Sequence, residues 1–301
     1  MAREKGYEMR RLSVVFLAAA SVLVLSASAP VGGASPEAIT GGEITAEDFD
    51  PSLFDDNSAT IDNEWLPLQP GTRFVYRGST EEDGERVPRR IVLTVTDLTK
   101  VISGVRAFVG WERDWSGGKL IESELFFLAQ DKDGNVWHLG EYAETWEEGD
   151  FVGGQAWLVG HLEGAKAGIF MKAEPRLGTP AYSEGFAPAP YYWNDFGKVF
   201  KTGQKTCVPA GCFEDVLVID EFEPSKPGAH QLKYYARGVG NVRVGWRGKD
   251  PDKEVLVLDR VVHLSPEAMA TARAKALELE TRAYVYGLTP PAEQWPIGDA
   301  G

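Results

Sequence analysis

The chain has few of the residues, and none of the sequence motifs, on which most enzymes depend. It holds two cysteines and four histidines in 301 residues. The histidines form no HExxH motif and no other close pair, the spacing by which zinc sites are recognised. A Gly-x-Ser-x-Gly elbow, a P-loop and a dinucleotide-binding fingerprint after a strand are also missing. The sequence therefore predicts neither a metal nor a cofactor, and it favours a protein that is not an enzyme.

Long hydrophobic runs are also missing, since a membrane-spanning helix needs about 20 apolar residues. The longest such run extends from Leu12 to Leu25, directly after Arg10 and Arg11, and small residues continue to Ala34. This layout is typical of a secretory signal peptide, which we place at residues 1–34. A retained N-terminal anchor is the alternative, but the run is short for one. We expect a secreted or extracytoplasmic protein of the bacterial cell envelope, with no integral membrane span after cleavage.

Positive charge is scarce. The chain has 31 Lys and Arg against 45 Asp and Glu, a formal net charge of −14. Removing the leader, with its four cations and two acids, gives a mature charge of about −16. A surface of this sign disfavours nucleic acid and anionic lipid, because both are bound by neutralising phosphates. We therefore expect no nucleic-acid partner.

Cys207 and Cys212 bracket the turn residues Pro209, Ala210 and Gly211. In an exported protein, two cysteines close in sequence predict a disulfide. A redox or metal role is not indicated, because four residues rather than two separate the cysteines and no second cluster exists. We interpret the pair as a structural disulfide.

Short runs of alternating apolar residues, separated by turn residues, dominate the rest of the sequence. They predict strands at 72–77, 90–97, 105–111, 120–129, 136–142, 216–222, 231–236, 241–246 and 254–264. Asp131–Asn135 reads as a hairpin turn rather than a calcium loop, because the twelfth position is Tyr142 and strands flank it. Residues 143–200 are rich in glycine, proline and aromatic residues and predict no clear elements. Their aromatic side chains either cover one end of the sheet or line a binding mouth.

The fold class that follows is mainly β, an antiparallel curved sheet or open barrel with one C-terminal α-helix. Ser265 and Pro266 form a helix start, and Met269, Ala272 and Ala276 fall on one helical face. The predicted organisation is a signal peptide (1–34), a flexible N-terminal arm (35–64), an antiparallel β domain (65–264), a helix packed on the sheet (265–287) and an extended tail (288–301).

Acidic and aromatic residues on the predicted strands supply the candidate binding residues. Glu122 and Glu124 are two apart on one strand, so they share a face, and a carboxylate pair beside an aromatic ring is what a glycosidase requires. Chance acid pairs are also expected in so acidic a chain. We select Glu124, Trp137, Glu141, Trp157 and Tyr234 as candidate ligand-binding residues.

Several motifs resemble those of a family of exported bacterial β-rich proteins without an assigned function. The family-like segments are PLQPGTRFVYRG at 67–78, QDKDGNVW at 130–137, GAKAGIFM at 164–171, VPAGCFEDVLV at 208–218 and KYYARGVG at 233–240. Residues 183–195 depart from the family pattern, which has an acidic pair there. The segments near 208–240 are also similar, more weakly, to periplasmic lipoprotein-carrier proteins, which are open barrels that hold acyl chains. The resemblance implies a fold and little about function.

Three functional hypotheses follow. The first is an exported, non-catalytic binding protein that holds a small apolar or envelope-derived ligand in a concave sheet. The second is a secreted glycan hydrolase that uses a carboxylate pair, one member of which has a raised pKa. The third is a structural or interaction module with an exposed apolar patch and no ligand.

Overall fold

The computed structural model describes residues 44–45, 47–189, 191–283 and 289–295. The proposed signal peptide therefore lies outside the described residues. The elements, in chain order, are β1 (Ile44–Thr45), the 3-10 helix η1 (Pro51–Leu53), β2 (Thr72–Glu82), β3 (Glu85–Ile102), β4 (Val105–Ser116), β5 (Lys119–Gln130), β6 (Val136–Glu147), β7 (Asp150–Leu158), β8 (Lys166–Met171), β9 (Ala181–Ser183), β10 (Gly185–Phe186), β11 (Phe196–Val208), β12 (Gly211–Phe222), β13 (Ala229–Ala236), β14 (Gly240–Gly248), β15 (Val255–His263), α1 (Pro266–Arg282) and β16 (Glu293–Gln294).

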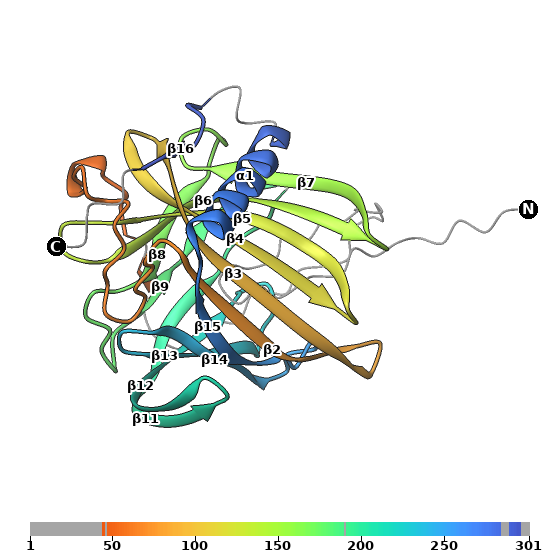
Figure 1. The fold of residues 1–301 in the computed structure, drawn as a ribbon. Coiled ribbons are helices and arrows are strands. Elements are labelled where there is room, and N and C mark those ends of the chain that lie inside the picture. Colours follow the sequence, from red (N-terminus) through yellow and green to blue (C-terminus); the bar gives the residue numbers. More distant parts are fainter. Residues whose placement is uncertain (1–43, 46, 190, 284–288, 296–301) are drawn as a thin grey trace, which may run out of the picture.

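The fold class is confirmed: one large, mainly antiparallel sheet, not closed, carries a single C-terminal helix (Figure 1). The order across the sheet is β1-β9-β11-β12-β13-β14-β15-β2-β3-β4-β5-β6-β8-β10. Its two ends approach each other, because β9 and β10 are separated by Glu184 alone, and β9 pairs with β11 while β10 pairs with β8. No continuous ladder joins them, so the barrel stays open.

Two-residue turns shape the long meander from β2 to β7. The loops are Asp83–Gly84, Ser103–Gly104, Gly117–Gly118 and Glu148–Gly149, and all eight residues have positive φ values between 49° and 95°. Two successive positive φ angles define the type I′ turn, whose twist matches that of the flanking strands. These tight turns account for strands that extend several residues beyond the apolar runs that predicted them.

The β5–β6 connection is the predicted hairpin. Asp131 Oδ1 accepts hydrogen bonds from the backbone N–H groups of Asp133 and Asn135 at 3.0 and 2.9 Å. Asp131 Oδ2 accepts a 2.8 Å bond from Trp137 Nε1. Asp131 therefore stabilises the turn and holds the Trp137 ring in place.

The glycine-rich stretch after β6 forms more strands than its sequence indicates. It contains β7, β8, β9, β10 and the start of β11. Trp157, Tyr182, Tyr191 and Trp193 are buried there. Glycine is used for close backbone approach: a Cβ on Gly168 would lie 2.1 Å from the Gly185 nitrogen. Sequence analysis found no alternation of apolar and polar residues here, because glycine has no side chain that could contribute to one.

Helix α1 lies over the outer face of the sheet and contacts β3 and β5 (Figure 1). Its buried residues are those predicted for one face, Met269, Ala272, Ala276 and Leu279, together with Glu280. Ser265 Oγ accepts a 3.3 Å hydrogen bond from the Ala268 N–H, so the predicted N-cap is present. The last helical residue described is Arg282, and the predicted end near residue 287 lies outside the described residues.

Buried ion pairs attach this helix to the sheet. Lys100 Nζ lies 2.9 Å from Glu280 Oε1, with side chains 0% and 5% exposed. Arg273 pairs with Asp97, and Arg282 with Glu144, both at 2.5 Å. Because a buried charge without its partner is costly, these pairs fix one position for the helix.

The described part of the N-terminal arm packs against the body. Phe49, Phe54 and Trp137 form a group of rings with centroids 5.6 to 6.1 Å apart. Phe54 and Ile61 are buried. Trp137 is therefore part of the packing beneath the arm.

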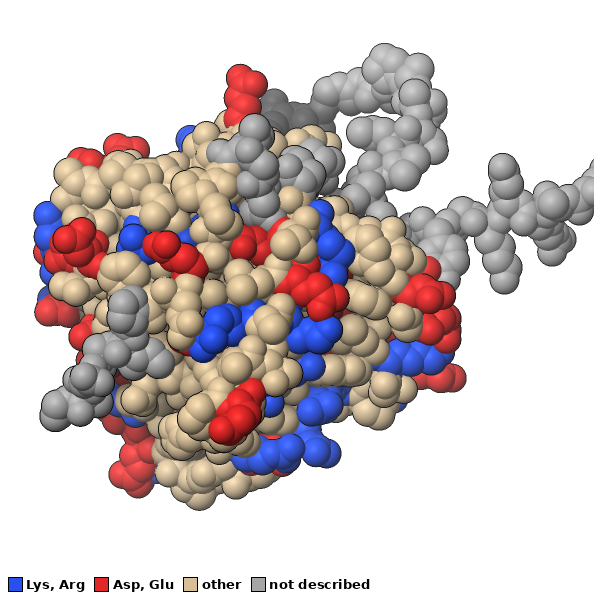
Figure 2. Space-filling view, turned by 45° about the horizontal axis from the view of Figure 1, so that its top comes forward, with Lys and Arg blue, Asp and Glu red and all other residues tan. Residues whose placement is uncertain are grey.

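The surface carries both signs of charge. Figure 2 shows blue Lys and Arg side chains grouped in the centre and lower right of one face, with red Asp and Glu side chains spread around them. Positive charge is locally concentrated even though the chain has a net charge of −14.

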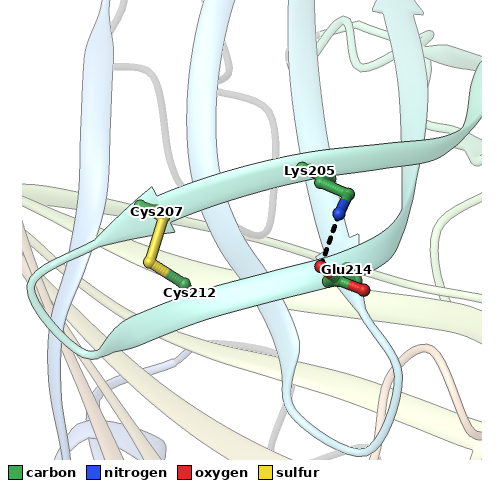
Figure 3. Close-up of a disulfide and its surroundings, with 4 residues drawn as sticks. All are labelled: Lys205, Cys207, Cys212 and Glu214. Atoms are coloured by element: carbon green, nitrogen blue, oxygen red, sulfur yellow. Dashed lines mark hydrogen bonds and ion pairs between the residues drawn. A yellow bond between two sulfur atoms is a disulfide. The ribbon is translucent and has the colours of Figure 1, made fainter.

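The predicted disulfide is present at the tip of the β11–β12 hairpin. Cys207 and Cys212 face each other in register. Two residues further from the turn on each strand, Lys205 Nζ lies 2.5 Å from Glu214 Oε1 (Figure 3). Both features tie the tip of an exposed hairpin together.

Candidate functional site

Carboxyl side chains gather on the inner face of the curved sheet. On β4 and β5, Glu112 pairs directly with Glu124, and Asp114 with Glu122. Directly paired residues project to the same side of a sheet, so four acids share this face. The complete set, here called the inner carboxyls, is Glu112, Asp114, Glu122, Glu124, Glu141, Glu184, Glu221 and Glu254.

Curvature of the sheet brings these residues into one group. Four strands separate β4 from β13, which would place them about 24 Å apart in a flat sheet. Yet Glu112 on β4 and Lys233 on β13 interact electrostatically. Glu141 on β6 likewise interacts with Asp195, which lies beside β11. Opposite parts of the sheet therefore face each other across its interior.

Two cations lie among the inner carboxyls. Arg89, 4% exposed, forms an ion pair with Asp114 and lies 3.7 Å from Glu254. Lys233, 2% exposed, lies 2.6 Å from Glu221 Oε2. Eight acids therefore share two cations, and most of the carboxyl groups have no counter-charge of their own.

Several inner carboxyl oxygens have no hydrogen-bond partner among the described residues. Both carboxyl oxygens of Glu112 are in this state, although the residue is only 1% exposed. One oxygen each of Glu122, Glu124, Glu184 and Glu254 is also buried and unpartnered. Buried polar groups are nearly always satisfied in folded proteins, so an unsatisfied cluster needs a specific explanation.

Burial raises the pKa of these acids. It raises the pKa of Glu141 and of Glu254 to about 8, and that of Asp114 to about 7 although Arg89 lowers it. The pKa values of Glu112 and Glu124 are also raised, first by burial and then by neighbouring carboxyls. Desolvation disfavours the charged form, and like charges add to this effect. Much of the inner face is therefore protonated at neutral pH.

For Lys233, the effect of neighbouring charges on the pKa is larger than the effect of burial. Burial alone would lower its pKa, but Glu221 and Glu184 outweigh burial, and the pKa of Lys233 is raised. It remains a cation, and it neutralises part of the acidic group.

Glu124 and Glu141 are neighbours in this group. Burial is the main cause of the raised pKa of both residues, and the charge of Glu141 raises the pKa of Glu124 further. The Trp157 indole lowers the pKa of Glu141, within an overall rise caused by burial. This arrangement brings together three of the five residues selected from the sequence.

An aromatic group adjoins this pair. The rings of Trp157 and Trp193 stack at 5.4 Å, and His138 lies edge-on to both at 4.9 Å. Burial lowers the pKa of His138 to about 3, so its ring is neutral. Trp193 Nε1 and Tyr182 Oη are buried donors without a hydrogen-bond partner in the described part of the chain.

The other two selected residues lie elsewhere. Trp137 packs under the N-terminal arm and donates to Asp131. Tyr234 projects from β13 on the side opposite its neighbours Lys233 and Tyr235, and the Arg243 guanidinium lies 5.2 Å from its ring centroid. The structure therefore does not bring either of them to the inner carboxyls.

Sequence analysis did not select most of the inner face. It missed Glu112, Asp114, Glu184, Glu254, Arg89 and Lys233. One signal was available: Glu112 and Asp114 occupy alternate positions of a strand between Trp111, Arg113 and Trp115, so neither face of that strand reads as simply apolar. Glu184 and Glu254 lie just outside regular strands, where no alternation marks them.

Within residues 44–295, apart from the few left undescribed, no group of three or more His, Cys, Asp or Glu side chains is placed to hold a metal ion. None of the described helices is both long and apolar enough to cross a bilayer.

No protein-family model and no curated protein matches the chain. A candidate exported protein with a YmcC-like fold from Bacteroides fragilis is similar in structure, with 16% identity, coverage of 66% of this chain and 98% of that one, and a TM-score of 0.36. A candidate lipoprotein from Parabacteroides distasonis has 13% identity, the same coverages and a TM-score of 0.28.

Proposed function

We propose that the chain is an exported, non-catalytic binding protein that takes an amine-bearing ligand at the inner carboxyls. The observation that carries the proposal is Glu112, whose two carboxyl oxygens are buried and unpartnered among other unpartnered acids. The signal-peptide pattern at residues 1–34 supports the export part of the proposal.

The chemistry of the inner face favours an amine over the apolar ligand that the sequence suggested. An acyl chain placed there would leave the inner carboxyls without partners, at a cost of about 1–3 kcal/mol for each unsatisfied group. A protonated amine offers up to three hydrogen-bond donors and a compensating charge. The stacked Trp157 and Trp193 rings add an aromatic surface of the type that attracts organic cations.

Binding of a cation at this face should release protons. Glu141 and Glu254, with pKa values of about 8, are mostly protonated at pH 7. A cation stabilises their charged forms and lowers their pKa values, so protons leave as the ligand binds.

The test is titration calorimetry of the mature protein at pH 7 with 1,4-diaminobutane and choline, and with hexadecanoate as the apolar comparator. Running each titration in phosphate and in MOPS reveals proton release, because the two buffers differ in ionisation enthalpy and neither is a primary amine. We expect an amine to bind with a buffer-dependent heat and hexadecanoate not to bind. Hexadecanoate binding without amine binding would instead support an apolar carrier and refute the proposal.

Two variants locate the site. Glu112→Gln and Glu124→Gln should each weaken amine binding by about tenfold or more, the loss of one charge-assisted hydrogen bond. The matched control is Glu214→Gln, since Glu214 is exposed and pairs only with Lys205 at the disulfide hairpin. Equal affinity in all three variants would place the amine elsewhere.

A glycan hydrolase is the second candidate, because Glu124 and Glu141 are a carboxyl pair with raised pKa values beside Trp157. A retaining glycosidase holds its two carboxyls about 5–5.5 Å apart, with one of them ionised. Glu124 and Glu141 instead both have raised pKa values, so neither is prepared to be the ionised member of the pair, and hydrolysis is the less favoured function. Release of reducing ends from envelope glycans, abolished by Glu124→Gln, would reverse that order.

A further inference from the structure

Arginine side chains line the outer face of five neighbouring strands. They form a transverse row in register: Tyr234 on β13 pairs with Arg243, Arg243 with Val257, Val257 with Arg77, Arg77 with Arg90, and Arg90 with Trp115 on β4. Paired residues share a face, so the whole row lies on one side of the sheet. Arg73, Arg113 and Arg260 project from the same side beside this row. We call the six arginines the arginine face.

Acidic partners are scarce on the arginine face. Asp259 pairs with Arg77 at 3.2 Å and with Arg260 at 2.6 Å. The other four arginines, Arg73, Arg90, Arg113 and Arg243, form no ion pair with any residue that the structure describes. In a chain with 14 more negative than positive charges, this segregation is unexpected. Positive side chains are grouped on the face shown in Figure 2.

Aromatic rings orient several of these guanidinium groups. Arg113 lies 4.2 Å from the Trp111 ring centroid, and Arg90 lies 4.7 Å from that of Trp115. A stacked guanidinium is held by its flat face, so its N–H edge is left to donate hydrogen bonds. Arg113 Nε is buried without a hydrogen-bond partner among the described residues.

The arginines of this face repel one another, and too few acidic side chains lie near them to neutralise their charge. Burial, together with repulsion from Arg73 and Arg90, lowers the pKa of Arg113 to about 10. A bound anion would relieve this repulsion.

We propose that the arginine face binds an acidic polysaccharide through its carboxylate groups. All six cations are arginines, whose planar fork matches a carboxylate with two parallel hydrogen bonds. The transverse row covers six strands, about 24 Å at the usual strand spacing, which fits a polymer better than a single small anion. This site is separate from the inner carboxyls, which lie on the other side of the sheet.

Other polyanions fit the face less well. Nucleic acid would stack its bases on exposed rings, but the Trp111 and Trp115 faces are covered by guanidinium groups. An acidic peptide would gain affinity by adding a strand at a sheet edge, whereas β2, β3 and β4 are paired on both sides. Membrane binding is strengthened by apolar side chains that insert, and Trp111 on this face is buried.

The test measures binding of the mature protein to polygalacturonate at 50 and 200 mM salt, with dextran, polyglutamate, DNA and phosphatidylglycerol vesicles as comparators. We expect polygalacturonate to bind most tightly and to weaken with salt, and dextran not to bind. If polyglutamate, DNA or vesicles bound as well as polygalacturonate, the assignment to an acidic glycan would be overturned, as it would by an absence of polygalacturonate binding.

Variants test the residues. Arg90→Gln combined with Arg113→Gln should weaken binding by at least about tenfold. Arg90→Lys with Arg113→Lys keeps the charge but loses the fork, and should still weaken binding several-fold. Arg176→Gln is the control, because Arg176 is an exposed loop residue that pairs with Glu174. Amine binding at the inner carboxyls should be unchanged in the Arg90/Arg113 variants, which also verifies their fold. Wild-type affinity in both double variants would refute the proposal.

Discussion

Stability should fall as pH rises through neutrality, the reverse of ordinary acid denaturation. The cause is that inner carboxyls such as Glu141 and Glu254 have folded-state pKa values of about 8, while unfolding returns them to about 4.5. Between these values the folded state holds protons that the unfolded state has lost, so stability declines with increasing pH. The contribution is fully present below pH 4.5 and is lost as pH rises through 8.

The window from pH 6.5 to 8 isolates this effect. Below pH 6.5, His138 opposes it, because its folded pKa of about 3 costs stability when the unfolded imidazole takes up a proton. Within the window, Glu141 and Glu254 alone should lower the free energy of unfolding by about 3 kcal/mol, at 1.36 kcal/mol per pKa unit. That is a large share of the 5–15 kcal/mol typical of a folded domain. Carboxyls with pKa values raised further act in the same direction.

Urea unfolding at pH 6.5, 7.25 and 8, at constant ionic strength, measures the decline directly. Glu141→Gln should remove about 1.5 kcal/mol of it, because glutamine does not titrate. The exposed control Glu214→Gln should leave the pH dependence unchanged. A free energy of unfolding that is flat or rises across the window would show that the inner carboxyls are not protonated in the folded protein, and the argument from burial would fail.

Two further substitutions test other parts of the fold. Lys100→Met should lower stability by about 3–5 kcal/mol, because it leaves Glu280 buried and unpaired, and adding Glu280→Gln should restore part of the loss in the same unfolding assay. If adding Glu280→Gln restored none of the lost stability, the helix would be held mainly by packing. Replacing Cys207 and Cys212 together by serine should cost about 2 kcal/mol or less, since the closed loop is short and the strands stay paired. A loss well above this value, measured by the same method, would mean that the hairpin depends on the disulfide for its structure.

Sequence patterns were sufficient for the fold class because its determinants are local. Alternation of apolar residues marked β2 to β6 and β12 to β15, and the Ser265–Pro266 start marked the helix. The segment that escaped, from β7 to β10, is the one in which glycine replaces the side chains that would show alternation. The approach of the two ends of the sheet there depends on backbone contacts such as that between Gly168 and Gly185, for which the sequence has no periodic signal.

The candidate site could be predicted only in part, because its members come from strands far apart in sequence. Glu124, Glu141 and Trp157 were found through composition and lie together on β5, β6 and β7. Glu112 and Lys233 could not be associated by sequence, since only the curvature of the sheet brings β4 opposite β13. Tyr234 was also selected, but it is one residue along the strand from Lys233, so its side chain projects to the opposite side of the sheet, beside Arg243.

The net charge of the chain differs from the charge that a partner meets at its surface, for a physical reason. The inner face contains eight acids and two cations, a formal contribution of −6 to the total of −14. If Asp114 and Glu221 are ionised beside Arg89 and Lys233 while the other inner carboxyls keep their protons, that contribution vanishes. The charge that a partner outside the sheet meets is then about −8 for the full chain and about −10 for the mature protein. It is also unevenly distributed, because the arginine face holds six cations against one acid. A polyanion responds to the local potential within about a Debye length, roughly 10 Å at 0.1 M salt, rather than to the total. An acidic composition therefore gives no reason to reject an anionic partner for this protein, and the salt dependence of polygalacturonate binding is the direct measure of that local field.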